Sequence, residues 1–122
     1  MRLPLTREFA QHFAEDWIAA WNSHDLEEIL SHYTDDIEMS SPLIVQLMAE
    51  ASGTLQGKPA VRSYWSRALA RPPALHFDLQ DVFVGASSVV ICYRGPRGPG
   101  AEAFWFSSEG KVYRAAAHYA QP

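Results

Sequence analysis

Apolar residues recur every four positions near the start of the chain, and this spacing predicts an amphipathic helix over residues 6–22. The apolar stripe consists of Phe9, Phe13, Trp17 and Trp21. Thr6 is placed to cap this helix, because a threonine hydroxyl accepts a hydrogen bond from a free N–H group of the first turn. A second helix is expected to begin at Asp25, and Glu28, three residues later, completes a capping box.

The middle of the chain carries short, mixed patterns that are broken by Pro and Gly. The expected segments are a strand at 37–41, a loop or short helix at 43–52, a strand at 53–56 and a helix that opens at 57–59 and ends at 71–73. Asp35 and Asp36 are assigned to the turn before the first strand rather than to a pair of catalytic carboxylates. Residues 43–52 are apolar without a clean period, which favours a cover over the mouth of a pocket.

The last third of the chain alternates between apolar and polar positions, as strands do. Strands are expected at 75–84, 89–94, 101–106 and 111–120, with a loop rich in Gly and Pro at 95–100. In the first of these strands the alternation places Leu75, Phe77, Leu79 and Phe83 on one side. The element order predicts one α+β domain over 1–122, with helices packed on one face of a curved antiparallel sheet.

Composition and charge exclude several classes of protein. The net charge is −4 and no Lys/Arg cluster is present, which argues against a nucleic-acid partner. No apolar stretch is long enough to span a bilayer, so we expect no membrane partner and a cytoplasmic location. Cys92, the single cysteine, is expected to be a buried strand residue. No phosphate-binding loop and no metal-ligand spacing appears, so no cofactor and no metal are predicted.

Three segments together resemble a known superfamily. These are WNSHDLEEILSHYTDDI at 21–37, GKPAVRSYW at 57–65, and the late SEGKV turn at 108–112 that precedes the HY pair at 118–119. The chain is similar to the nuclear-transport-factor-two-like superfamily, and most of all to its SnoaL-like members. The resemblance implies a cone formed by a bent sheet around a long helix, with a deep pocket at the open end, and a homodimer through the outer face of the sheet. It implies no single chemistry, because this fold carries many activities.

The steroid isomerases of that superfamily allow a comparison residue by residue. Ser41, before Pro42, stands where those enzymes have a carboxylate base, and Trp17 stands where they have a tyrosine. Serine cannot exchange a proton near neutral pH without an activating base, and an indole does not release its proton. Only the third isomerase group has an acidic counterpart here, Glu102. The comparison therefore predicts that the chain has no steroid isomerase activity.

Glu102 and His118 are the candidate catalytic residues. If Glu102 shares the inner face with Phe104 and Phe106, it lies among aromatic rings and its pKa should rise. If the strand is offset by one residue, Glu102 faces solvent or a partner subunit. His118 suits proton transfer near neutral pH, but it would point outward if Tyr119 points into the pocket. Sequence leaves both orientations open.

Two hypotheses for function follow. In the first, the pocket binds a small, largely apolar molecule without chemistry. In the second, the protein is a small acid–base enzyme, a cyclase, isomerase or dehydratase-like lyase that uses Glu102 as proton carrier. Both hypotheses share one predicted set of ligand-binding residues: Trp17, Trp21, Tyr33, Met39, Ser41, Trp65, Phe104 and Tyr119.

Overall fold

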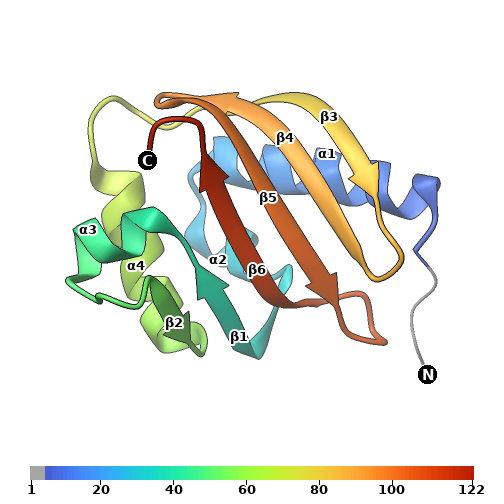
Figure 1. Ribbon diagram of the computed structural model, residues 1–122, viewed down its shortest axis with the longest axis horizontal. Coiled ribbons are helices and arrows are strands. Elements are labelled where there is room, and N and C mark those ends of the chain that lie inside the picture. Colours follow the sequence, from blue (N-terminus) through green and yellow to red (C-terminus); the bar gives the residue numbers. More distant parts are fainter. Residues whose placement is uncertain (1–4) are drawn as a thin grey trace.

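The computed structural model describes residues 5–122 and has a six-stranded sheet with helices on one side. Figure 1 shows helix α1 running behind the sheet and α3, α4 and β2 gathered at one end. The elements in chain order are α1 (Arg7–Ser23), α2 (Leu26–Leu30), β1 (Tyr33–Ser40), α3 (Pro42–Met48), β2 (Thr54–Gln56), α4 (Lys58–Ala70), β3 (Asp78–Val84), β4 (Ser88–Gly95), β5 (Gly98–Phe106) and β6 (Val112–Tyr119). This arrangement confirms the predicted α+β class.

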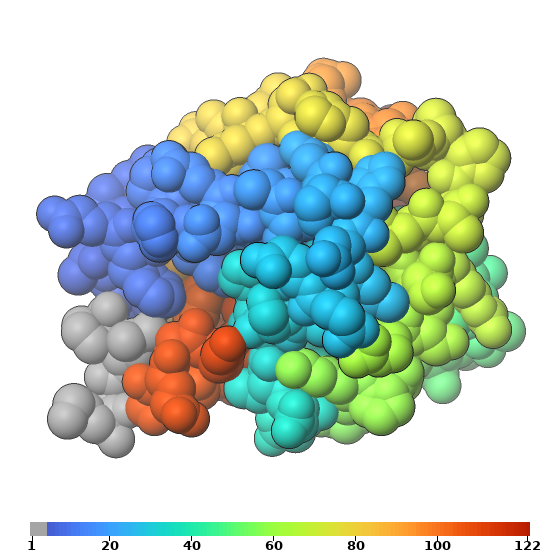
Figure 2. All heavy atoms as spheres, turned by 180° about the vertical axis from the view of Figure 1, so that it is seen from behind, coloured from blue at the N-terminus to red at the C-terminus, as the bar shows by residue number. Residues whose placement is uncertain are grey.

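The strand order in the sheet is β2-β1-β6-β5-β4-β3. Each strand from β3 to β5 pairs antiparallel with the next strand along the chain, so β3 to β6 form an antiparallel meander. Strand β1 pairs parallel to β6, so the N-terminal half of the chain closes against its last strand. Figure 2, from behind, shows α1, α2 and α4 covering this side of the molecule.

The two predicted N-cap residues are confirmed, but the capping box with Glu28 is not, because the Asp25 N–H donates to the Ser23 hydroxyl. The Thr6 hydroxyl accepts a hydrogen bond from the N–H of Phe9, and α1 follows immediately. The Asp25 carboxylate accepts from the N–H groups of Glu27 and Glu28 and begins α2. Helix α1 then ends at His24, which adopts a left-handed backbone conformation with φ of 60°.

The predicted turn at Asp35 and Asp36 is wrong. Strand β1 already begins at Tyr33, and both aspartates are exposed strand residues. The physical reason is pairing between distant segments, because Tyr33 lies opposite Val112 of β6 and the Val112 N–H donates to the His32 carbonyl. Local sequence carries no information about a partner 79 positions away. The turn therefore lies earlier than the acidic pair suggests.

Of the two alternatives for residues 43–52, a loop or a short helix, the structure has the helix: Ser41 caps α3 and Pro42 occupies its first turn. One detail of the predicted strand pattern needs correction. Phe83 was expected on the inner face, but its side chain is 54% exposed and Val82 is buried instead. A register shift between Leu79 and Asp81 reverses the alternation in the second half of β3.

The core lies between α1 and the inner face of the sheet. Side chains from α1 interdigitate with β5, and Phe13 makes edge contacts with Phe104 at 5.0 Å and with Phe106 at 4.9 Å between ring centroids. Within residues 5–122 no helix is long and apolar enough to cross a membrane. The cytoplasmic location stays a prediction.

Candidate functional site

A cavity of about 340 Å³ opens at the end of the sheet where α4 and the β4–β5 hairpin meet the second half of α1. The volume lies within the range of small-molecule sites. Most of the lining is aromatic or aliphatic. The lining residues are Trp17, Trp21, Met39, Leu43, Tyr64, Trp65, Ala68, Arg71, Pro72, Pro73, Leu75, Phe77, Tyr93, Gly95, Pro96, Arg97, Gly98, Glu102 and Tyr119.

Three indoles form one wall of the cavity. Trp17 and Trp21 are four residues apart on α1 and therefore share a face of the helix. Trp65 of α4 meets Trp21 edge to face, with 5.3 Å between ring centroids. The Trp17 indole N–H donates to the hydroxyl of Tyr33 at 2.9 Å, so it is already engaged and not free for a ligand.

Phe77 and Tyr93 adjoin the indoles and extend the aromatic lining. The two rings stack at 4.4 Å, and Phe77 also stacks on Trp17 at 5.6 Å. The Asn22 side chain holds the Phe77 backbone with two hydrogen bonds, accepting from its N–H at 2.7 Å and donating to its carbonyl at 2.9 Å. This pair of bonds connects the segment before β3 to the end of α1.

Glu102 lies in the interior of the cavity and is only 4% exposed. It pairs with Ile91 of β4 and Ala117 of β6, in the middle of the sheet. Of the two orientations that sequence left open, the structure therefore has the inward one. Phe104, two residues later, is buried on the same face, whereas Ala101 and Ala103 lie on the other.

Burial raises the pKa of the Glu102 carboxyl to about 8. The Tyr93 hydroxyl, at 3.5 Å from Oε1, is at the outer limit of a hydrogen bond and lowers this pKa only in part. At pH 7 the carboxyl is therefore mostly neutral and can donate a hydrogen bond to a ligand oxygen. Above its pKa the same group becomes a buried base.

Three phenolic hydroxyls, those of Tyr64, Tyr93 and Tyr119, are also among the polar groups of the cavity. Burial raises the pKa of Tyr119 to about 12 and the pKa of Tyr93 far above its usual value, so both stay protonated at physiological pH. The Tyr64 hydroxyl donates to Ser41 Oγ at 3.1 Å. Tyr119 lines the cavity together with Tyr64 and Tyr93, so three phenolic hydroxyls share this space with Glu102.

The structure divides the predicted site residues into two groups. Those that line the cavity are Glu102, Trp17, Trp21, Met39, Trp65 and Tyr119. Tyr33, Ser41 and Phe104 are buried but do not line it. Tyr33 lies behind Trp17, and the Ser41 hydroxyl accepts from the N–H of Leu43 while Tyr64 covers it. These three residues support the wall and do not face a ligand.

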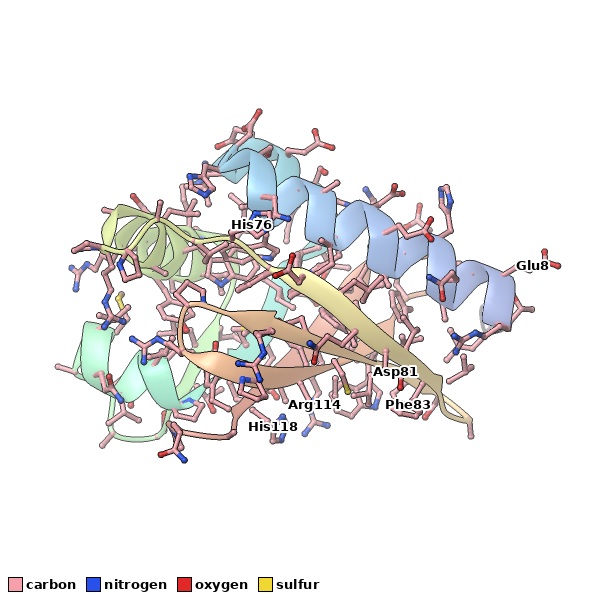
Figure 3. All side chains as sticks on the ribbon, turned by 90° about the horizontal axis from the view of Figure 1, so that it is seen from above. Glu8, His76, Asp81, Phe83, Arg114 and His118 are labelled. Carbon is pink, nitrogen blue, oxygen red and sulfur yellow. The ribbon has the colours of Figure 1, made fainter. Side chains whose placement is uncertain are left out.

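His118, the second catalytic candidate, is not in the cavity. Ala115 and Ala117 take the inner face of β6, so His118 points outward and is exposed. Figure 3 shows His118 and Arg114 on the side of the sheet opposite α1. The His118 ring contacts the carbonyl of Ala116 at 3.1 Å. Strand alternation gives one position to Tyr119 and the opposite one to His118, which excludes His118 from chemistry in the cavity.

The lining residues that sequence reasoning missed include Phe77, Tyr93, Arg71 and Arg97. Tyr93 could have been found, because it alternates with the apolar residues Val89 and Ile91 along β4. The two arginines carry no local signal. Arg71 follows a helix and Arg97 occupies a hairpin tip, and only the tertiary structure brings the two segments together. Within residues 5–122, no three His, Cys, Asp or Glu side chains are close enough to hold a metal ion.

Comparisons with known proteins agree with this architecture. Residues 14–119 match the SnoaL-like domain family, and the chain belongs to that family. A solved structure of a SnoaL-like protein of unknown function from Burkholderia thailandensis is 51% identical, with a TM-score of 0.91 over 96% of this chain and 98% of that one. The comparison with curated proteins finds no match.

More distant structures share the fold alone. A protein of unknown function with a cystatin-like fold from Methylobium petroleophilum is 16% identical, with a TM-score of 0.73 over 97% of this chain and 80% of that one. SalBIII, an epoxide hydrolase/cyclase-like enzyme in pyran ring formation in salinomycin, is 14% identical, with a TM-score of 0.74 over 91% of this chain and 90% of that one. At such identities the function has to be argued from this chain's own site.

Proposed function

We propose that this protein binds a small, largely apolar molecule in the cavity beside α1. The observation that carries the proposal is the cavity itself, about 340 Å³ in volume and lined by three indoles and few polar groups. Apolar pockets with a small number of placed polar groups are typical of small-molecule sites. A ligand that places an oxygen next to Glu102 would receive a hydrogen bond from its neutral carboxyl.

Binding can be tested with 2-tetralone, a neutral bicyclic ketone, by isothermal titration calorimetry. The variant Ala68→Trp would place an indole in the cavity, because Ala68 is a lining residue of α4. Ala70→Trp is its matched control, since Ala70 lies two residues further on the same helix and is exposed. The proposal expects binding by wild type and Ala70→Trp and a loss with Ala68→Trp. Equal binding by all three proteins, or no binding by wild type, would refute it.

A second candidate function is acid–base catalysis at Glu102. The specific observation in its favour is a single buried carboxyl in the cavity, with a pKa of about 8 and a tyrosine hydroxyl beside it. Such a group can give a proton to a ligand oxygen and take one from an adjacent carbon, as cyclisation, isomerisation and dehydration require. Its pKa near the working pH suits both directions of transfer.

This candidate can be tested by exchange of the acidic α-protons of 2-tetralone in D2O, followed by proton NMR. Wild type should accelerate the exchange, and the rate should rise with pH through about 8 as Glu102 ionises. Glu102→Gln should bind the ketone but lose the acceleration. If Glu102→Gln exchanges the protons as fast as wild type, the acid–base candidate fails and binding without chemistry remains.

The proposal includes a homodimer through the outer face of the sheet. This face carries Phe83, which is 54% exposed, and side chains of both signs, Asp81 and Arg114, so it can be complementary to a second copy across a twofold axis. Sedimentation velocity provides the test. Ala103→Glu, in the middle of this face, should give a monomer, and Ala19→Glu, exposed on α1, should not. A monomeric wild type would exclude the dimer.

A further inference from the structure

Two arginines at the mouth of the cavity have no part in the chemistry described above. Arg71 follows the last turn of α4, and Arg97 occupies the tip of the β4–β5 hairpin. Both are lining residues and both are half-buried. Three other arginines have partners: Arg62 pairs with Glu27, Arg67 donates to the carbonyl of Leu47, and Arg114 pairs with Glu38. Within residues 5–122 Arg94 has no such partner either, but it is exposed and does not line the cavity. Within residues 5–122 neither guanidinium at the mouth has a carboxylate at ion-pair distance.

The backbone holds Arg97 in place over the cavity. Gly95 pairs with Gly98, so Pro96 and Arg97 alone form the turn of the hairpin, and Gly98 has a φ of 93° that favours glycine. A Cβ at Gly95 would lie 2.9 Å from the Phe77 ring, which shows how closely the hairpin packs on the cavity wall. Arg97 is thus attached to a fixed turn and not to a free loop.

The positive charge of Arg97 acts on two tyrosine hydroxyls that line the cavity. Burial raises the pKa of both Tyr64 and Tyr119, and the Arg97 guanidinium opposes this rise at each hydroxyl. Both phenols line the same cavity as Glu102. A group held by Arg97 would therefore lie close to the polar groups of the cavity.

The lining residues of the cavity carry a net positive charge, whereas the whole chain carries a net negative charge. The chain has a net charge of −4, yet its lining contains two arginines and only one carboxyl, Glu102. With a pKa of about 8, that carboxyl is ionised in only about a tenth of the molecules at pH 7. The two guanidinium charges are therefore not balanced by any lining residue. A bound anion would provide the missing partner, because a guanidinium group forms strong charge-assisted hydrogen bonds with carboxylate and phosphate groups.

We infer that the natural ligand is an amphipathic anion whose carboxylate or phosphate group binds Arg71 and Arg97 at the mouth. Its apolar body then lies among the indoles and reaches toward Glu102. This inference rests on the proposed function, because it requires that the cavity hold a small molecule. The neutral state of Glu102 fits such a ligand, since an ionised carboxyl in the interior would repel a second negative charge.

The test compares ligands that share one apolar body and differ in their head group. Isothermal titration calorimetry at pH 7 and low salt would use 2-naphthoate, 2-naphthyl phosphate and the neutral 2-naphthamide. Wild type should bind at least one of the anions about tenfold more tightly than the amide, the ratio that one charge-assisted hydrogen bond supplies. The anion that binds more tightly identifies the head group. Added salt should reduce this preference, because half-exposed charges are screened.

Variants assign the preference to the two arginines. In Arg71→Gln/Arg97→Gln, the anions and the amide should bind equally within about twofold, because the neutral side chains keep the shape but not the charge. Arg94→Gln is the matched control, since Arg94 lies on the same hairpin, is exposed and does not line the cavity. It should keep the full preference.

The outcomes separate this inference from the proposed function. If 2-naphthamide binds wild type as tightly as the anions do, and Ala68→Trp blocks it, the cavity binds small molecules and the anion inference is wrong. A preference that survives in the double variant would also overturn the inference. If none of the three compounds binds wild type, both the inference and the proposed function fail.

Discussion

The space between α1 and the sheet has a filled end and a hollow end. At the filled end Phe9 and Phe13 of α1 pack against Phe106, with ring centroids 5.1 and 4.9 Å apart. At the hollow end, one to two turns further along the same helix, Trp17 and Trp21 face a cavity of about 340 Å³. The same helix and the same sheet form both ends. The difference lies in the side chains and in what closes the space.

The comparison shows that size does not decide which end is filled. Tryptophan is larger than phenylalanine, yet the indoles border the cavity and the phenyl rings fill the core. The hollow end is bordered by residues of α4 and the β4–β5 hairpin in addition to those of α1. Glu102 and the tyrosine hydroxyls face the cavity there. The filled end is packed aromatic core, and the hollow end contains the candidate site.

The largest expected effect is at the border between the two ends. Phe104 is fully buried and contacts both Phe13 and Trp17. Phe104→Ala should lower the free energy of unfolding by about 3–5 kcal/mol, because it removes a buried ring and leaves a cavity. Urea denaturation measures this change. Val45→Ala, at an exposed apolar position of α3, is the control and should change stability by less than about 0.5 kcal/mol.

If Phe104→Ala is as mild as the Val45→Ala control, the filled end is not the stabilising part of the core, and the contrast between the two ends breaks down.

The next effect concerns the charge state of the hollow end. Glu102 has a pKa of about 8 in the folded protein and near 4.5 in the unfolded chain. Between these two values the folded state binds a proton that the unfolded chain has released. The contribution of Glu102 to the free energy of unfolding is therefore largest below about pH 4.5 and is lost as pH rises through about 8. The slope is at most about 1.4 kcal/mol per pH unit. Glu102→Gln removes this titration.

Urea denaturation of wild type and Glu102→Gln at several pH values measures the effect. The stability of the variant relative to wild type should increase steadily from about pH 5 to about pH 8. A difference between the two proteins that does not change with pH would mean that Glu102 titrates normally, and the hollow end would then lack its raised pKa.

A smaller effect is expected at the wall of the cavity. A Cβ at Gly100 would lie 2.9 Å from Cε1 of Tyr93, so the glycine makes room for the ring that faces Glu102. Gly100→Ala should destabilise the protein by about 1–3 kcal/mol through overpacking. In a Tyr93→Ala background the same change should be nearly neutral, because the clash is gone. Equal costs in both backgrounds would show that Gly100 does not position Tyr93.

The smallest effect is expected outside both ends. His118 is exposed on the outer face of β6, so His118→Ala should leave the affinity for 2-tetralone within about twofold of wild type. Calorimetric titration measures this. Trp65→Ala provides the contrast, since Trp65 lines the cavity and its removal should weaken binding clearly. A loss of binding with His118→Ala would contradict the outward orientation of the imidazole.

Local patterns predicted the helices better than the strands. The caps at Thr6 and Asp25 are correct because a cap is decided by residues within one turn of each other. The start of β1 and the orientation of Phe83 were wrong because each depends on pairing with a distant strand and on a register shift. An alternating pattern gives a strand, but not the position at which the alternation reverses.

The sequence by itself determined the α+β class, the family, the aromatic stripe of α1 and the carboxyl that shares a strand face with Phe104. These follow from periodicity, capping and motifs that act over a few residues. Only the tertiary structure decided that Glu102 faces a cavity, that His118 does not, and that Arg71 and Arg97 line the same cavity. Those facts depend on how segments far apart in the chain pack together, and a local sequence pattern does not predict that packing.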